Sequence, residues 1–114
     1  MDRLLWLSDS PLVHTGYSNQ TLNILNGLKE DFECHQLAHN AITQPLPPGV
    51  SFKDGTRVDY WIHGNGREQY CKDIMLNKIA KYQPKFFITL LDTFMLFPWI
   101  MNYNFSPAHS IFYL

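Results

Sequence analysis

The first part of the chain passes from an apolar run to a polar loop and then to a helical pattern. Leu4–Leu7 is a short apolar run typical of a buried strand, and the loop after it ends at Thr15. From Gly16 onward, leucines at 22, 25 and 28 predict an amphipathic helix. A glycine at a helix start lets backbone approach an anion, and the first-turn N–H groups and dipole favour a phosphate there. Gly16 therefore indicates either a phosphate site or only a sharp turn.

The middle of the chain predicts a second strand and a small hairpin. Phe32–Ala38 is strand-like, and its mixed polar residues place it near the edge of a sheet. Asp54-Gly55 between two strand-like runs is a hairpin signal, and the second arm, Val58–Ile62, is expected to reach the main sheet. Gly64-Asn65-Gly66 follows and lacks the third glycine of a dinucleotide-binding loop. It is either a plain turn or a second phosphate or sugar contact.

The second half of the chain predicts a helix followed by the central strand. Apolar residues recur at spacings of three and four over Arg67–Tyr82, which predicts a helix that ends before Gln83-Pro84. Phe86–Leu91 is apolar or β-branched throughout and carries no charge. Such a strand is typical of the centre of a parallel sheet that is covered on both faces.

The last part of the chain predicts a short helix and a final strand. Thr93 can cap a helix, although Pro98 would break a long one. His109–Leu114 predicts a strand in which the chain stops, so we expect a domain that is truncated at its C-terminus. Aromatic residues crowd the segment from Phe94 to Phe105. They form core by default, or else a contact surface that makes a homo-oligomer, which a concentration series in light scattering would test.

Strands that alternate with helices predict an α/β fold. We expect one domain over residues 1–114, with a Rossmann-like, doubly wound and mainly parallel sheet, helices on both faces and a small β-hairpin insertion. The expected strand order is third, second, first, fourth, fifth. Right-handed crossovers then place Gly16, Gly64 and Asp92 along one edge of the sheet.

Composition and charge exclude some classes of partner. The chain has 9 basic and 10 acidic residues with no run of like charge, which argues against nucleic acid. No apolar run reaches the ~18–20 residues that span a bilayer, and the N-terminal segment does not have the pattern of a signal peptide. Cys34 and Cys71 stand far apart without a partner motif, so reduced thiols and a cytoplasmic location are expected.

Three polar side chains of the loops are candidates for chemistry. Asp92 ends the central strand, where its carboxylate can accept a hydrogen bond from a sugar hydroxyl or cap the following turn. Asp9 ends the first strand, and its turn-like neighbours favour a local role. His14 can face a substrate from the loop, but a lone loop histidine more often faces water.

Two segments resemble a known enzyme family. SDSPLVHTGYSNQT, over Ser8–Thr21, and FFITLLDTFML, over Phe86–Leu96, resemble the N-terminal domain of family-4-like glycosyltransferases of the GT-B fold. Many members of that family have two glycines in the first loop, whereas Thr15 precedes Gly16 here.

The resemblance implies a function and roles for four residues. The implied reaction transfers a sugar from a nucleotide-sugar donor to a sugar, lipid or protein acceptor, with retention of configuration and without a bound metal or other cofactor. Gly16, flanked by Thr15 and Tyr17, would face the donor diphosphate, and Asp92 would contact the acceptor. The family's nucleotide pocket and most of its basic residues belong to a second domain that this chain does not contain. The 114-residue chain is therefore expected to be the acceptor-side domain and to show no turnover by itself.

Three classes of protein are alternatives to a glycosyltransferase. A nicotinamide dehydrogenase would have a three-glycine loop and an acidic residue at the end of the second strand, where Ala38-His39-Asn40 stands. A phosphate-accepting receiver domain would have paired acids after the first strand and a lysine at the end of the last. A non-catalytic interaction or ligand-binding module would use the aromatic segment.

Overall fold

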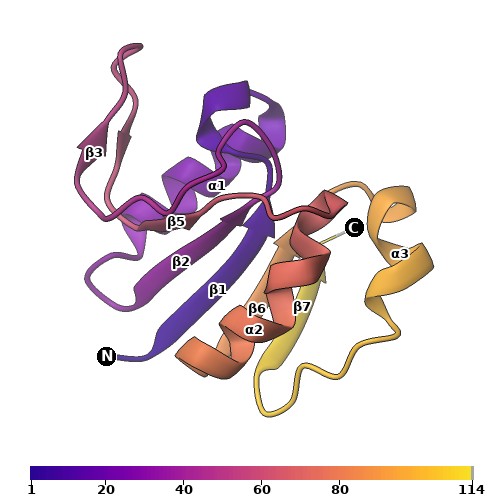
Figure 1. Ribbon diagram of the computed structural model, residues 1–114. Helices are drawn as coiled ribbons and strands as arrows, with labels where there is room; N and C mark the ends of the chain where they lie inside the picture. Colours follow the sequence, from indigo (N-terminus) through magenta and orange to yellow (C-terminus); the bar gives the residue numbers. More distant parts are fainter. Residues whose placement is uncertain (114) are drawn as a thin grey trace.

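A five-stranded, fully parallel sheet forms the centre of the molecule (Figure 1). The computed structural model describes the backbone of residues 1–113 and the side chains of these residues except 93–95, 97 and 113. The sheet order is β5-β2-β1-β6-β7, which confirms the predicted order of third, second, first, fourth and fifth strands. The strands are β1 (Arg3–Ser8), β2 (Glu33–Ala38), β5 (Trp61–His63), β6 (Phe86–Leu90) and β7 (His109–Tyr113).

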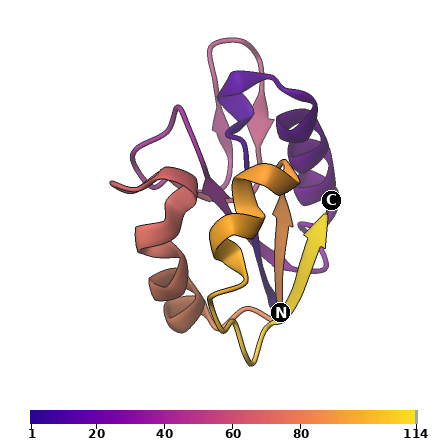
Figure 2. The ribbon, with the colours of Figure 1, turned by 90° about the vertical axis from the view of Figure 1, so that its right-hand side faces the viewer.

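Helices cover both faces of this sheet, as predicted (Figure 2). Helix α1 (Gly16–Gly27) packs on one face, whereas α2 (Lys72–Tyr82) and α3 (Thr93–Ile100) pack on the other. Two short 3-10 turns, η1 (Pro11–Val13) and η2 (Gln69–Cys71), precede α1 and α2. The described residues contain no helix that is long and apolar enough to cross a membrane.

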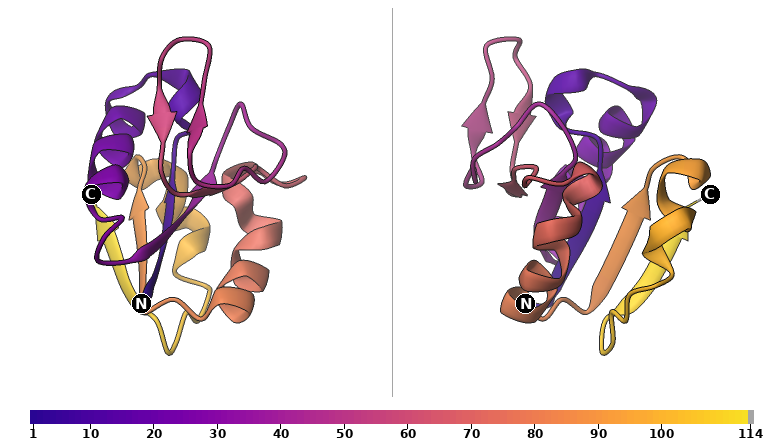
Figure 3. Two further views of the ribbon diagram at one scale, coloured as in Figure 1. Left: turned by 90° about the vertical axis from the view of Figure 1, so that its left-hand side faces the viewer. Right: turned by 45° about the vertical axis from the view of Figure 1, so that its right-hand side comes forward.

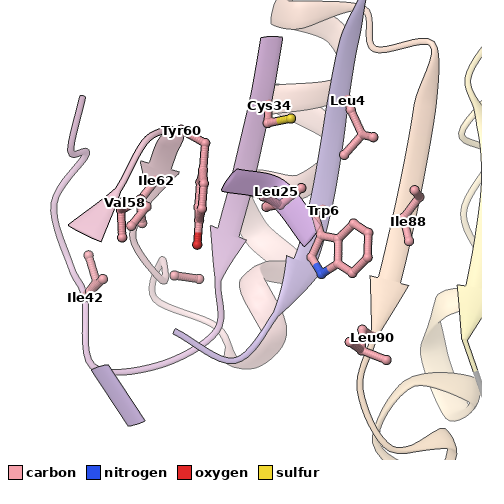
Figure 4. Packing of buried hydrophobic residues seen from close by; sticks show 11 residues of the cluster. Leu4, Trp6, Leu25, Cys34, Ile42, Val58, Tyr60, Ile62, Ile88 and Leu90 are labelled. Carbon is pink, nitrogen blue, oxygen red and sulfur yellow. The ribbon is translucent and has the colours of Figure 1, made fainter. Parts of the chain in front are cut away.

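The alternation of side chains along β1 divides the core into two layers. Leu4 and Trp6 point to the α1 face, where they pack with Leu25 (Figure 4). Leu5 and Leu7 point to the opposite face, toward α2 and α3. Because β1 is buried on both faces, an almost uniformly apolar run is what its position requires.

Strand β2 lies next to the edge strand, in agreement with its mixed composition, but its polar residues are buried. His35 and Gln36 are 2% and 0% exposed. They are tolerated inside because each forms side-chain hydrogen bonds.

A small hairpin leaves the sheet between β2 and β5 (Figure 3). Its arms, β3 (Val50–Ser51) and β4 (Arg57–Val58), pair antiparallel. The predicted arm Val58–Ile62 is in fact divided, since β4 ends at Val58 and a separate strand, β5, joins the main sheet at Trp61. An isolated bridge from Leu46 to Ile62 covers the outer edge of β5.

Helix α2 begins five positions later than the predicted start at Arg67. Tyr70 and Cys71 adopt left-handed backbone conformations, with φ of 59° and 58°, which interrupt a continuous helix. Two hydrogen bonds from side chains stabilise this turn. The Asp73 carboxylate accepts from the Arg67 N–H, and His39 Nδ1 accepts from the Tyr70 N–H. The predicted end at Tyr82 is confirmed.

The two glycines before this turn are packing positions. A Cβ on Gly64 would lie 2.5 Å from the carbonyl carbon of Thr43, and a Cβ on Gly66 would collide with the Asp73 carboxylate. Gly64 is thus explained by close approach to the backbone of residues 42–44, whereas the clash at Gly66 is with the end of the Asp73 side chain.

The last helix and strand differ from the prediction in detail. Helix α3 contains Pro98 and is short, as expected for a helix with a proline inside it. Its N-cap residue is Asp92 and not Thr93. Strand β7 is described to Tyr113, and Leu114 lies outside the described residues. Within the aromatic segment, Phe105 is buried against Phe87 with their ring centroids 4.8 Å apart, so part of this segment is core. The oligomeric state stays a prediction.

Candidate functional site

A shallow pocket of about 440 Å³ lies where β1 and β6 end and α1 begins. This is the edge of a parallel sheet where ligands are generally bound. The pocket brings together the four residues to which the resemblance gives a role and a further candidate, Asp9, and Gln20 completes it. Its lining residues are Asp9, Thr15, Gly16, Tyr17, Gln20 and Asp92. Gly64 does not line it, although it was expected along the same sheet edge.

Thr15 fixes the start of α1. Its Oγ1 accepts a hydrogen bond from the Ser18 N–H at 3.1 Å, as an N-cap residue does, and donates one to Asp9 Oδ2 at 2.7 Å. The Thr15 hydroxyl is thus engaged by the protein itself. The backbone N–H groups of Gly16 and Tyr17 have no acceptor among the described residues, so these two donors remain available to a ligand.

Gly16 is not explained by packing or by backbone strain. It is the first residue of α1, and a Cβ added to it would meet no heavy atom within 4 Å. Its φ lies outside the left-handed region, and the left-handed residue of this loop is His14, with φ of 54°. The sharp-turn interpretation of Gly16 therefore loses its physical reason, whereas close approach of a ligand still provides one.

Asp92 and Tyr17 join β6 to α1 across the pocket. The Tyr17 hydroxyl donates a hydrogen bond to Asp92 Oδ1 at 2.6 Å. Asp92 has extended backbone geometry at the N-cap position of α3, but its side chain makes no capping hydrogen bond, so the capping alternative is not what is observed. The hydrogen bond to Asp92, followed by burial and by the charges of Asp92 and Asp9, raises the pKa of Tyr17. The Tyr17 hydroxyl therefore stays protonated over the neutral pH range and can donate its hydrogen bond to Asp92.

The charge of the pocket favours hydroxyl groups over a free phosphate. Asp9 and Asp92 both line it, and none of its described lining residues is basic. Carboxylates accept hydrogen bonds from hydroxyl donors and repel anions at close range. Among the described residues of the pocket, only the N-terminus of α1 favours negative charge.

A buried polar network supports the loop that carries Asp9. Gln36 Nε2 donates to the Asp9 carbonyl oxygen at 2.7 Å and to Ser8 Oγ at 3.2 Å, and Gln36 Oε1 accepts from the Tyr60 hydroxyl at 3.1 Å. The network reaches α1 through Thr21, whose Oγ1 lies 2.7 Å from Ser8 Oγ. Sequence reasoning missed these residues, because an isolated Gln or Ser in a strand gives no sign that it is buried.

The remaining candidates have structural partners outside the pocket. His14 Nε2 lies 2.7 Å from Asp54 Oδ2, so the expectation that His14 only faces water is incomplete: it contacts the tip of the hairpin. Cys34 and Cys71 are free thiols, both buried. Among the described residues, no group of three or more His, Cys, Asp or Glu side chains has the arrangement of a metal site.

Comparisons of the chain with models of protein families, with curated proteins and with solved structures found no match.

Proposed function

We propose that this chain is the acceptor-side domain of a glycosyltransferase that uses a nucleotide-sugar donor, and that the pocket at the start of α1 holds the reacting sugars. The observation that supports the proposal best is the convergence of Thr15, Gly16, Tyr17 and Asp92 on one pocket. Thr15, Gly16 and Tyr17 belong to one of the two segments that resemble family-4-like glycosyltransferases, and Asp92 belongs to the other. Only the fold brings the two segments together.

The pocket residues divide into an anion side and a hydroxyl side. The free N–H groups of Gly16 and Tyr17, with the dipole of α1, would stabilise charge on the departing diphosphate. The carboxylates of Asp9 and Asp92 would accept hydrogen bonds from sugar hydroxyls and so orient the acceptor. The proposal also includes retention of the configuration of the transferred sugar and a reaction without a bound metal. Both properties are implied only by the family resemblance.

The acidic lining also requires a source of positive charge outside this pocket. Two carboxylates beside a diphosphate would weaken its binding unless basic side chains approach from elsewhere. The resemblance implies that a second domain supplies them. The 114-residue chain is therefore expected to bind a nucleotide sugar weakly and to have no turnover by itself.

Substitution of Gly16 tests the proposal. Gly16→Val adds a β-branched side chain at the first residue of α1 and should abolish the weak donor binding of the chain, because loss of one well-placed anion contact costs about 2–4 kcal/mol. Isothermal titration of a nucleotide sugar into the chain measures the loss, and circular dichroism verifies folding.

Gly27→Val is the matched control. Gly27 is the last residue of the same helix, and a Cβ there also meets open space, so the two variants share their helix and their chemical change. We expect Gly27→Val to bind like the wild type. Equal affinity of Gly16→Val and wild type in folded proteins, or turnover by the chain alone, would contradict the proposal.

A further inference from the structure

Two buried histidines lie between the sheet and α2. His35 of β2 and His63 of β5 are 2% and 3% exposed. His35 Nδ1 lies 3.0 Å from His63 Nε2, and the two rings are nearly parallel. Tyr82, the last residue of α2, packs on both, with ring centroids 4.2 Å from His35 and 5.3 Å from His63. The pair therefore joins the β2–β5 side of the sheet to the end of α2.

The hydrogen bonds fix the positions of the protons. Glu33 Oε2 lies 2.8 Å from His35 Nε2, and a carboxylate can only accept, so His35 Nε2 carries a proton. In the neutral ring His35 Nδ1 is then the acceptor, and His63 Nε2 must donate to it. This leaves His63 Nδ1 as a bare acceptor. The atom is buried and has no hydrogen-bond partner among the described residues.

The surroundings of His63 Nδ1 disfavour a second proton. Lys78 and Lys81 of α2 act on His63 with like charge, and burial together with these lysines lowers the pKa of His63 to about 4. The carboxylate that faces the pair is Glu33 of β2, which contacts His35 and not His63. That carboxylate is also shared with Arg3 of β1, whose Nε lies 2.6 Å from the same Oε2.

The other groups around the pair provide no compensating negative charge. Tyr82 contacts both histidines through its ring, and the Arg3 guanidinium and the Lys81 ammonium group both lie over that ring. Trp61 of β5, which stacks on His35, does not titrate. For His35 itself, burial outweighs the attraction of Glu33 and lowers the pKa. The neutral form of both rings is thus the one that fits the closed structure.

We propose that Glu33, His35 and His63 form an acid-sensitive latch that holds α2 against the β2–β5 side of the sheet and releases it when His63 Nδ1 takes a proton. The latch depends on the geometry of the pair and not on the function of the pocket. Opening lets water solvate the imidazolium and separates it from the lysines of α2, so acid favours the open form.

Amide hydrogen exchange on the wild-type chain measures the opening. After correction for intrinsic rates, amides of α2 should exchange about twentyfold faster at pH 5 than at pH 7, because His63 binds a proton more readily in the open form. At pH 5 they should also exchange faster than amides of β1, which the latch does not hold. An α2 rate that is independent of pH, or a common rate for α2 and β1 at pH 5, would overturn the latch.

Two variants assign the effect to His63. His63→Gln keeps an Nε2 donor for His35 Nδ1 but cannot take a proton, so its α2 exchange should not accelerate in acid. His109→Gln removes an exposed histidine of β7 and should behave like the wild type. Acceleration in His63→Gln equal to that of the wild type would exclude the latch.

A measurement on the wild type keeps the proposal testable if His63→Gln does not fold. The nitrogen chemical shifts of the His63 ring should indicate the Nε2–H tautomer at pH 7 and a titration midpoint well below 6.5. The Nδ1–H tautomer, or a midpoint at or above 6.5, would overturn the proposal.

Discussion

At the scale of single residues, the hydrogen bond from Tyr17 to Asp92 organises the pocket. The two residues are 75 positions apart, and each is placed by its own element, Tyr17 by the first turn of α1 and Asp92 by the end of β6. The sequence indicated Asp92, since it follows the most apolar strand, and Tyr17, since it follows Gly16. It could not indicate their contact, which depends on the packing of α1 against β6.

Asp92→Asn should lower the pKa of Tyr17 toward its ordinary value. The hydrogen bond to the Asp92 carboxylate is the main cause of the raised pKa, and an amide lacks the negative charge that resists ionisation of the phenol. The titration of the Tyr17 ring carbon by NMR measures the change. Tyr103, a half-buried tyrosine that does not line the pocket, is the internal control. The same Tyr17 midpoint in variant and wild type would mean that the contact is not formed.

His63 should make the chain less stable in mild acid. Its pKa is about 4 in the folded chain against about 6.5 when unfolded, so the unfolded state binds more protons between these values and stability falls as pH decreases through them. Between pH 7 and 4.5 the titration of His63 should lower the free energy of unfolding by about 2–3 kcal/mol. His63→Gln should lose this part of the fall and keep the part that comes from other groups with a lowered pKa, such as His35. Urea unfolding curves measure it. A wild-type stability that does not change over this range would exclude a buried, neutral His63.

At the scale of elements, the hydrophobic pattern predicted the strands and helices, whereas side-chain packing determined where some of them begin. The apolar run of β6 and the Gln83-Pro84 end of α2 follow from residue type alone. The late start of α2 does not, because it depends on left-handed geometry at Tyr70 and Cys71, residue types that rarely adopt it. Asp73 and His39 hold this turn from positions that no local pattern connects to it.

Gly64→Ala should destabilise the chain through the loop after β5. The added Cβ would lie 2.5 Å from the Thr43 carbonyl carbon, so backbone must move, at a cost of about 1–3 kcal/mol. Gly27→Ala is the control, since its Cβ meets open space in a helix and should be neutral or stabilising by up to about 1 kcal/mol. Thermal and urea unfolding of both variants measure the difference. Equal stabilities would show that the loop relaxes freely and that Gly64 is not a packing position.

At the scale of the whole molecule, the order of strands could be predicted because few arrangements satisfy the pattern. A central apolar strand, helices between parallel strands and right-handed crossovers together favour the observed order. The division of the hairpin arm into β4 and β5 could not be predicted, since it depends on tertiary contacts such as the hydrogen bond from the Asp59 N–H to Asn26. The buried polar network under Asp9 was missed for the same reason.

The position of the pocket follows from this order. Once β1 and β6 are neighbours, their carboxyl ends bring the loops that contain Asp9 and Asp92 to the same edge, and α1 returns from there. Residue type and topology together thus predicted that the loops containing Asp9 and Asp92 would lie at one edge of the sheet. The charge of the pocket became evident only when its lining residues were assembled.

Amide mapping tests most directly the proposal that this pocket binds a nucleotide sugar at the start of α1. A nucleotide sugar is added to the ¹⁵N-labelled chain, and backbone amide shifts are followed by NMR. We expect saturable shifts that are largest at Gly16 and Tyr17, whose N–H groups have no acceptor among the described residues, with smaller shifts near Asp92. Unchanged amides at Gly16 and Tyr17, or saturable shifts centred instead on Gly64-Asn65-Gly66, would contradict it.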